Sequence, residues 1–459
     1  MRLLTLALLF GALTASAQYK AVNPKISKIV SEVSEDRIAD NLKKLEGFQT
    51  RYIFSSQDDP VHGVGAARKW IYEQFRSYSP RLEVSFDQYR LKKETTRGTR
   101  IIDDVDLYNV VAVLPGLTDK EERVMITAHY DTVNMGRPAG APPPQPGDAP
   151  APAANRDPNM PAPGVTDDGS GVACVMELAR VMSQYEFDKT LVFVTFAGEE
   201  EGLLGATLYA QRAKSLNQKI EAVLNNDIIG SDLGGDGRME NRRVNIFSED
   251  PIDSPSREIA RYAREVGERY VPSMTVDPVF RADRFGRGGD HTAFNMEGFA
   301  AVRFSTPVEN FANQHSATDT FANTSPKYIA QVTKVNGAVA ASLAWAPKSP
   351  LTTEEIERNG RKVPSLMLTR GKNRYDALLK WKQENPEADL AGYVVMSRRT
   401  TAPFWEREIY VGNVTEYTLP AVSIDELVFG VKAIDKEGNE SLTSPYVQGP
   451  RQKRKIEVY

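Results

Sequence analysis

The spacing of apolar and polar positions divides the chain into three regions. From Ile26 to about Tyr78 the apolar residues recur at helical spacing. From there to about Trp345, runs of β-branched and aromatic residues alternate with helical patterns. Uninterrupted apolar runs are typical of strands buried on both faces of a parallel sheet. The alternation predicts an α/β domain with a mostly parallel central sheet and helices on both of its faces.

The expected elements of this region are short and regularly placed. Strands are expected at residues 109–113, 124–128, 191–196, 220–224 and 300–304. Helices are expected between them at residues 171–185, 203–214 and 256–270. A segment rich in Pro, Ala and Gly, residues 137–164, interrupts the pattern. We expect it to be a long irregular loop that overhangs the candidate site.

Beyond residue 348 the pattern changes to short strand-like runs separated by turn signals. Such spacing predicts a small all-β sandwich over residues 348–447, with Trp381 in its core. The sandwich resembles a fibronectin type III module, which implies a contact with partners, surfaces, polymers or the first domain. A basic tail, residues 448–459, follows it.

The first residues are typical of a secretory signal peptide. Arg2 precedes an apolar stretch that ends near Ala15-Ser16-Ala17, an expected cleavage site. We therefore expect residues 1–17 to be removed, the α/β domain to occupy residues 18–347, and the protein to be secreted or periplasmic. No later apolar run approaches the ~18 residues that span a membrane, so no stable membrane span is expected.

Composition narrows the function classes. The chain has 459 residues, of which 26% are charged, and a formal net charge of -4. This composition is typical of a globular protein, and it lacks the excess of basic residues that nucleic-acid binding requires. The one cysteine, Cys174, lies in an apolar helical pattern, so we expect a small core residue and no cysteine-protease chemistry.

An acidic cluster at a strand end is the clearest chemical signal. Glu199 and Glu200 closely follow the apolar run 191–196. Carboxylates at the end of a buried strand repel one another and resist desolvation, so a cation is expected beside them. Ligands of open α/β sheets also bind beyond the carboxyl ends of the strands. A solvated acidic turn is the alternative that this segment alone leaves open.

Other polar side chains follow strands in the same way. His129 stands two residues before Asp131, whose carboxylate can orient a metal-bound imidazole, although a structural hydrogen bond explains that spacing equally well. Asp167 and Asp168 precede a helix, and Asp168 alone is equally explained as a helix cap. His315 lies in a polar loop beyond the strand at 300–304.

Together these residues suit a catalytic zinc site. The ligand-type groups at or after strand ends are His129, Asp167, Glu200, Asp227 and His315. A mixed nitrogen and oxygen set with open positions is typical of catalytic zinc. Three carboxylates and a bridging hydroxide balance the charge of two Zn²⁺ ions, so two zinc ions are expected.

At this point residues 26–345 closely resemble the di-zinc aminopeptidase family that includes bacterial leucyl aminopeptidases, glutamate carboxypeptidases and glutaminyl cyclases. The motifs, in the family's order, are Ala-His-Tyr-Asp, Asp-Asp-Gly-Ser-Gly, Gly-Glu-Glu-Glu-Gly-Leu-Leu-Gly, Asn-Asn-Asp-Ile-Ile-Gly and Gln-His-Ser-Ala-Thr-Asp-Thr.

The resemblance implies a role for each residue. One zinc would be held by His129, Asp167 and Asp227, and the other by Asp167, Glu200 and His315. Glu199 would be the general base and Asp131 the histidine orienter. The peptide bond between Asp167 and Asp168 would be cis.

The resemblance implies an exported zinc exopeptidase that acts on peptides or proteins, and we favour an aminopeptidase. A carboxypeptidase or dipeptidase is the main alternative, because Arg281, Arg284 and Arg287 could neutralise a substrate carboxylate. A glutaminyl cyclase, which works with a single zinc, and a non-catalytic binding protein are less favoured, since all five ligands and the base are present.

Three further residues have open assignments. His291 is expected either beside the site, facing substrate, or in a structural role. His62 is expected to be structural or exposed. Glu201 is expected to be solvated or structural rather than catalytic.

Overall fold

The computed structural model describes residues 22–94, 100–136, 157–358, 360–372, 375–384 and 387–447. The expected signal peptide, the basic tail and residues 137–156 of the Pro-rich segment lie outside these ranges, so those expectations stay predictions. The chain divides into two units, with the boundary between Trp345 and Ala346.

The larger unit is built on an eight-stranded sheet with strand order β1-β2-β4-β3-β5-β8-β6-β7. Its strands are β1 (Glu83–Leu91), β2 (Val105–Leu114), β3 (Asp119–His129), β4 (Lys189–Phe196), β5 (Lys219–Asn226), β6 (Arg243–Ser248), β7 (Thr275–Val279) and β8 (Ala301–Ser305). The four central strands, β4, β3, β5 and β8, are parallel. The pairs β1–β2, β2–β4 and β6–β8 are antiparallel, so the sheet is mixed and the parallel expectation holds at its centre.

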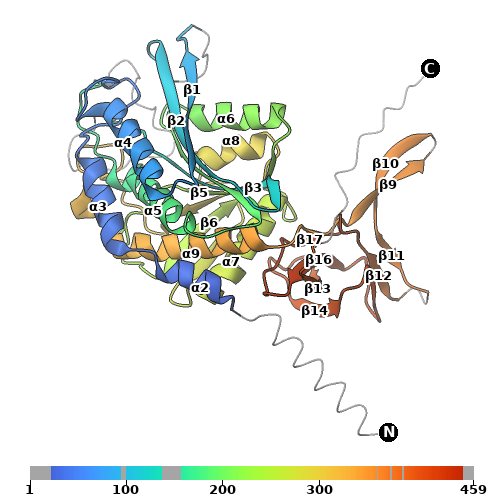
Figure 1. The fold of residues 1–459 in the computed structure, drawn as a ribbon. Coiled ribbons are helices and arrows are strands. Elements are labelled where there is room, and N and C mark those ends of the chain that lie inside the picture. The colour runs from blue at the N-terminus through green and yellow to red at the C-terminus, as the bar shows by residue number, and fades with distance from the viewer. Residues whose placement is uncertain are drawn as a thin grey trace. The chain divides into compact units, whose positions relative to one another are not determined.

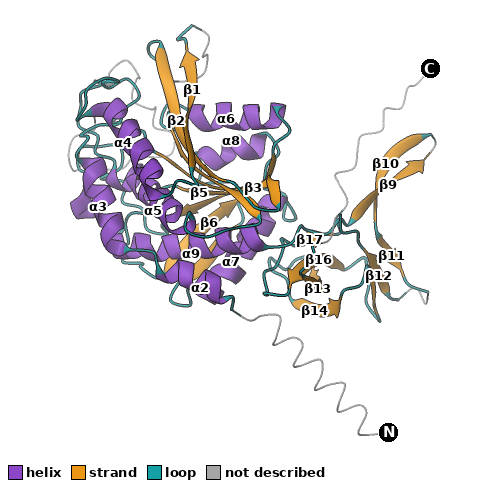
Figure 2. Ribbon diagram, in the orientation of Figure 1, coloured by secondary structure: helices purple, strands orange, loops and turns teal. Residues whose placement is uncertain are grey.

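Helices cover both faces of this sheet, which confirms the expected α/β class (Figures 1 and 2). They are α2 (Pro24–Ser31), α3 (Glu35–Glu46), α4 (Gly63–Tyr78), α5 (Ser170–Met182), α6 (Leu204–Ser215), α7 (Pro255–Tyr270), α8 (Asp290–Met296) and α9 (Pro326–Trp345). Helices α6 and α8 pack together on one face, and α3, α5, α7 and α9 lie on the other.

Strand β4 shows why the apolar runs form the centre of the sheet. All of its residues are buried, as expected for a strand covered on both faces. Its alternate residues Val192, Val194 and Phe196 pack in one core cluster with Tyr209 of α6 and Phe294 of α8. Burial of this kind contributes roughly 1.5–3 kcal/mol per large apolar side chain.

The smaller unit contains only strands among its described residues, as the pattern predicted. They are β9 (Thr353–Arg358), β10 (Arg361–Leu366), β11 (Leu368–Arg370), β12 (Ala377–Lys380), β13 (Leu390–Arg399), β14 (Arg407–Gly412), β15 (Glu416–Leu419), β16 (Leu427–Asp435) and β17 (Ser444–Pro445). The sheets β11-β12-β15 and β14-β13-β16-β17 share one core that contains Trp381. The likeness to fibronectin type III stays a prediction.

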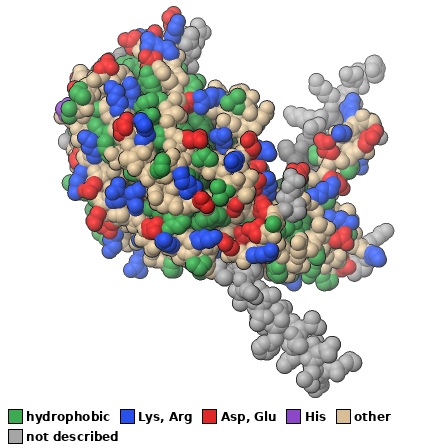
Figure 3. Space-filling model, in the orientation of Figure 1, with side chains coloured by type: hydrophobic (Ala, Val, Ile, Leu, Met, Phe, Trp, Pro, Cys, Tyr) green, Lys and Arg blue, Asp and Glu red, His purple; other side chains and the backbone are tan. Residues whose placement is uncertain are grey.

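The visible surface carries acidic and basic side chains interspersed with apolar ones (Figure 3). Among the residues that the structure describes, no helix has the length and apolar character needed to cross a bilayer.

Candidate metal centre

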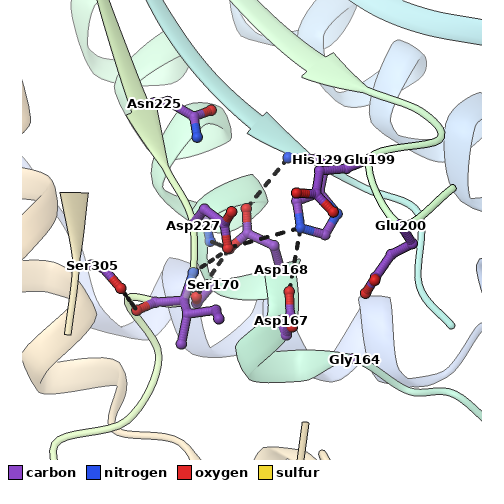
Figure 4. Close-up of polar contacts among 12 residues, drawn as sticks. His129, Gly164, Asp167, Asp168, Ser170, Glu199, Glu200, Asn225, Asp227 and Ser305 are labelled. Carbon is purple, nitrogen blue, oxygen red and sulfur yellow. Dashed lines mark hydrogen bonds and ion pairs between the residues drawn. The ribbon is translucent and has the colours of Figure 1, made fainter. Parts of the chain in front are cut away.

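The candidate residues meet at the carboxyl ends of the central strands. His129 ends β3, Glu199 and Glu200 follow β4, Asp227 follows β5, and His315 lies in the loop after β8. Because these strands are parallel neighbours, their ends share one edge of the sheet. Asp167 enters from the turn η2 (Val165–Gly169), which precedes α5 (Figure 4).

Asp167 lies between the two histidines. Its Oδ1 is 3.3 Å from Nε2 of His129, and its Oδ2 is 3.0 Å from Nε2 of His315. Each carboxylate oxygen therefore faces a different imidazole, which is the arrangement that a carboxylate bridging two cations requires.

The remaining candidates complete two clusters around Asp167. Nε2 of His315 is 3.1 Å from Oε1 of Glu200, and Nε2 of His129 is 3.9 Å from Oδ1 of Asp227. Within the described ranges, two groups have ligand atoms within 4.8 Å of one another. They are His129, Glu199 and Asp227, and Asp167, Glu200 and His315. Glu199 thus lies within reach of His129 and Asp227.

The chemistry of the donor set fits zinc. The five proposed ligands offer two imidazole nitrogens and carboxylate oxygens from three residues, gathered at one edge of the sheet. Oε1 of Glu200 is buried, and it faces Nε2 of His315. Burial raises the pKa of Asp227, and it raises that of Glu199 well above the usual range. Such buried acids are costly to ionise without a cation, so the cluster suits positive ions.

Asp131 faces both His129 and the acidic turn. The group nearest to Nδ1 of His129 is the backbone carbonyl of Asp131, at 3.1 Å, whereas the carboxylate Oδ1 is 3.6 Å away. The Asp131 carboxylate accepts hydrogen bonds from the backbone N–H groups of Glu199 and Glu200, each at 3.2 Å. Asp131 therefore fixes the acidic turn in addition to facing the imidazole.

Asp168 supports the site without facing the proposed ions. Its Oδ1 accepts from the backbone N–H of Gly171, at 2.9 Å, and of Ile228, at 3.2 Å. Its Oδ2 accepts from the N–H of His129 at 3.3 Å. The bond to Gly171, in the first turn of α5, favours the helix-cap interpretation of Asp168, although the N-cap residue is Gly169. Asp168 also ties η2 to the ends of β3 and β5. The Asp167–Asp168 bond is cis, as the resemblance implied.

Sequence reasoning missed three buried residues that hold this geometry. Asp319 accepts from the backbone N–H of Asp167 and of Thr166, each at 2.9 Å. Arg51 donates to the carbonyls of Tyr130, at 2.6 Å, and of Gly164, at 2.8 Å, and so links the two loops that carry His129 and Asp167.

The third missed residue is Arg303 of β8. Its Nη2 lies 2.9 Å from Oδ1 of Asp227, and its Nη1 donates to Asp283 at 3.0 Å. The only available signal was an arginine inside the apolar run Ala301 to Phe304, because a buried arginine needs an acidic partner.

The other two histidines and Cys174 make structural contacts and belong to neither cluster of candidate ligands. His291 is fully buried, and its Nε2 lies 2.7 Å from the carbonyl of Ala282, which favours its structural alternative. His62 is the N-cap residue of α4 and lies 3.1 Å from the Gln49 amide. Burial raises the pKa of the Cys174 thiol to about 12, in agreement with a core role.

A pocket of about 380 Å³ opens onto the cluster. It is lined by Asp167, Glu199, Glu200, Asp227 and His315 together with residues of neighbouring loops. Arg284 and Arg287 line it, whereas Arg281 does not. Glu201 also lines it but is buried, so the expectation of a solvated side chain is wrong and the structural alternative remains.

Comparison with known proteins agrees with this geometry. The family described as "Peptidase family M28" matches residues 109–340. A protein of Pyrenophora tritici-repentis named "Probable zinc metalloprotease" is 32% identical, over 91% of this chain and 96% of its own length. Another protein of that name, from Pyricularia oryzae, is 35% identical, over 91% of this chain and 83% of its own length.

Solved structures show the same fold at lower identity. The LapA aminopeptidase of Legionella pneumophila is 20% identical, with a TM-score of 0.51 over 71% of this chain and 75% of that one. A glutaminyl cyclase of Macrostomum lignano is 16% identical, with a TM-score of 0.51 over 69% and 91%. Likeness at this level supports the fold alone.

Proposed function

This chain belongs to peptidase family M28 and is a zinc metallopeptidase, and from that premise we propose that it is an exopeptidase that removes N-terminal residues using two zinc ions. The observation that carries the proposal is the Asp167 carboxylate between His129 and His315, with Glu199 beside it. His129, Asp167 and Asp227 would hold one ion, and Asp167, Glu200 and His315 the other.

Bound zinc ions would lower the pKa of a water molecule and polarise the scissile carbonyl. Glu199 would act as the general base, taking the proton of the attacking water and delivering it to the leaving amine. Its burial supports this role, because desolvation raises the pKa of the Glu199 carboxyl and so makes its carboxylate a stronger base. Asp131 keeps Glu199 in place through the backbone of the acidic turn.

A carboxypeptidase or dipeptidase is the second candidate, and a specific observation favours it. Of the arginines that the sequence offered for a substrate carboxylate, Arg284 and Arg287 line the pocket. A glutaminyl cyclase is less favoured, because that activity uses a single zinc and the ligand set for two is complete.

The test is a panel of hydrolysis assays with the zinc-loaded protein. Aminoacyl-p-nitroanilides, N-blocked peptides and peptides ending in glutamate are compared for wild type and Glu199→Gln. We expect cleavage of the aminoacyl substrates and a loss of about 10²–10⁴-fold in kcat for Glu199→Gln, with its zinc retained. If zinc binds but no peptide is cleaved, the proposed function fails; full activity of Glu199→Gln would overturn the general-base assignment.

A further inference from the structure

Three arginines line the pocket that contains the proposed metal ligands. The lining residues include Arg100, Arg284 and Arg287. The lining carboxylates other than Glu201 all belong to the proposed metal and base set, whereas none of these arginines does. The pocket therefore offers positive charge that catalysis by the metal site does not use.

Arg287 is fixed in position and still open to the pocket. Its Nη1 donates to Oε2 of Glu309 at 2.9 Å, and its Nη2 donates to Oε1 of Gln314 at 3.3 Å. Its guanidinium also lies 5.5 Å from the ring of Phe311. The side chain remains 31% exposed. Its other N–H groups have no hydrogen-bond partner in the part of the chain that the structure describes, so they can donate to a ligand.

Arg287 lies close to the proposed metal ligands. Gln314, which orients it, is the residue before His315. Although burial lowers the pKa of Arg287, the carboxylates of Glu309, Asp167 and Asp227 raise it, and the guanidinium stays charged. An anion bound to Arg287 would consequently lie near the proposed metal ligands.

Arg284 adds to this charge. Its Nε donates to Asp283 at 3.0 Å, and its Nη1 lies 3.3 Å from the same Glu309 oxygen that Arg287 uses. One Glu309 carboxylate therefore faces two guanidinium groups. Because Asp283 and Glu309 also face this pair, the open N–H groups of Arg287 are the donors left for a ligand, and arginine pairs well with carboxylates because of its planar fork of donors.

We propose that the Arg284–Arg287 pair binds a carboxylate of the substrate close to the scissile bond, with Arg287 as the main contact. The favoured substrates are then short peptides whose residue next to the scissile bond carries a negative charge. That charge comes either from a free C-terminal carboxylate, as in a dipeptide, or from an Asp or Glu side chain. This inference rests on the proposed function, because it assigns the substrate class of the same site.

The experiment compares matched substrates on the zinc-loaded enzyme. Leu-Ala against Leu-Ala-amide tests the terminal carboxylate, and Leu-Glu-amide against Leu-Gln-amide tests the side-chain carboxylate. We expect kcat/KM to favour the charged member of at least one pair by about 10-fold to 100-fold, mainly through KM. The pair that shows the preference identifies the source of the carboxylate.

Variants then assign the preference to Arg287. Arg287→Met is expected to bring the ratio close to one, and Arg287→Lys to restore part of it. Arg281→Met is the matched control, since Arg281 is an exposed arginine of the same segment outside the pocket lining. It should leave the ratio unchanged. Circular dichroism and zinc content establish that each variant is folded.

The outcomes separate this inference from the proposed function. Equal kcat/KM within both wild-type pairs, while the uncharged amides are cleaved, would overturn carboxylate binding and leave the peptidase intact. An undiminished ratio in Arg287→Met would overturn the assignment to Arg287. If Arg287→Met does not fold, the wild-type pairs and Arg287→Lys still decide. Failure to cleave any substrate, including Leu-p-nitroanilide, would count against the proposed function itself.

Discussion

The two halves of the proposed metal centre differ in how the protein balances their negative charge. The inner half-site, His129 and Asp227, is almost fully buried, and Arg303 lies 2.9 Å from the Asp227 carboxylate. In the outer half-site, Glu200 and His315, the His315 side chain is 20% exposed. Among the described residues Glu200 has no arginine or lysine side-chain partner for its carboxylate. Asp167 is shared by both.

This difference indicates that the two half-sites depend on bound metal to different degrees. The inner half-site has its own cation, so its geometry depends less on bound metal, but Arg303 competes with an ion for Oδ1 of Asp227. The outer half-site has only its histidine as a positive partner. We therefore expect the inner half-site to contribute more to the stability of the metal-free fold, and the outer one to gain more from bound zinc.

Substitution of His129 or His315 should distinguish the two half-sites, and it should have the largest effect on activity. His129→Ala and His315→Ala should each lower kcat/KM at least about 100-fold and reduce bound zinc from two towards one. Metal-free His129→Ala should lose about 2–4 kcal/mol of unfolding free energy, because a buried side chain and its partners are disrupted.

The loss for metal-free His315→Ala should be closer to 1 kcal/mol, since that side chain is partly exposed. Urea unfolding with chelator present and elemental analysis of zinc provide the two readouts. Equal stability losses in the two variants would contradict the proposed difference between the half-sites.

Substitution of Arg303 should weaken the inner half-site only when metal is absent. Arg303→Met leaves the buried carboxylates of Asp227 and Asp283 without their shared cation. We expect a loss of about 3–5 kcal/mol in the metal-free protein and a larger rise in Tm on zinc addition than in wild type. Thermal unfolding with zinc and with chelator measures both. An unchanged zinc-induced rise would show that Arg303 does not compete with the ion.

The smallest expected effect is a gradual change of zinc affinity with pH. Although burial lowers the pKa of His315, the carboxylates of Glu200 and Asp167 raise it to about 10 in the metal-free protein. Zinc must displace this proton, so its apparent affinity should rise by up to about 10-fold per pH unit between pH 7 and 9. Calorimetry in buffers of different ionisation enthalpy would measure the released proton, and His315→Ala should release fewer.

The raised pKa of His315 also predicts how the stability of the metal-free protein changes with pH. A raised histidine pKa stabilises the folded state fully below the ordinary value of about 6.5, and this contribution is lost as the pH rises through about 10. A metal-free protein that gained stability over that interval would contradict the His315 ion pairs.

Local sequence patterns were sufficient for the centre of the fold and the candidate ligands. The strands β3, β4, β5 and β8 each contain a mostly apolar run that could be recognised alone, and polar residues after these runs mark the edge of the sheet. Strands β1, β6 and β7 were missed because they lie towards the edges of the sheet and include half-exposed positions.

The supporting contacts could not be predicted, since they join residues far apart in sequence. Arg303 meets Asp227 and Arg51 meets Tyr130 only after the chain has folded. Asp131 looked like a histidine orienter from its spacing, yet its carboxylate also holds the turn that carries Glu199. Such roles depend on loop geometry, which apolar periodicity does not encode.

The central claim is that the five proposed ligands hold two zinc ions that share Asp167. Anomalous diffraction at the zinc absorption edge, on crystals of the zinc-loaded protein, tests it most directly. We predict two peaks, one near His129, Asp167 and Asp227 and the other near Asp167, Glu200 and His315. A single peak, or ions bound away from Asp167, would contradict the account.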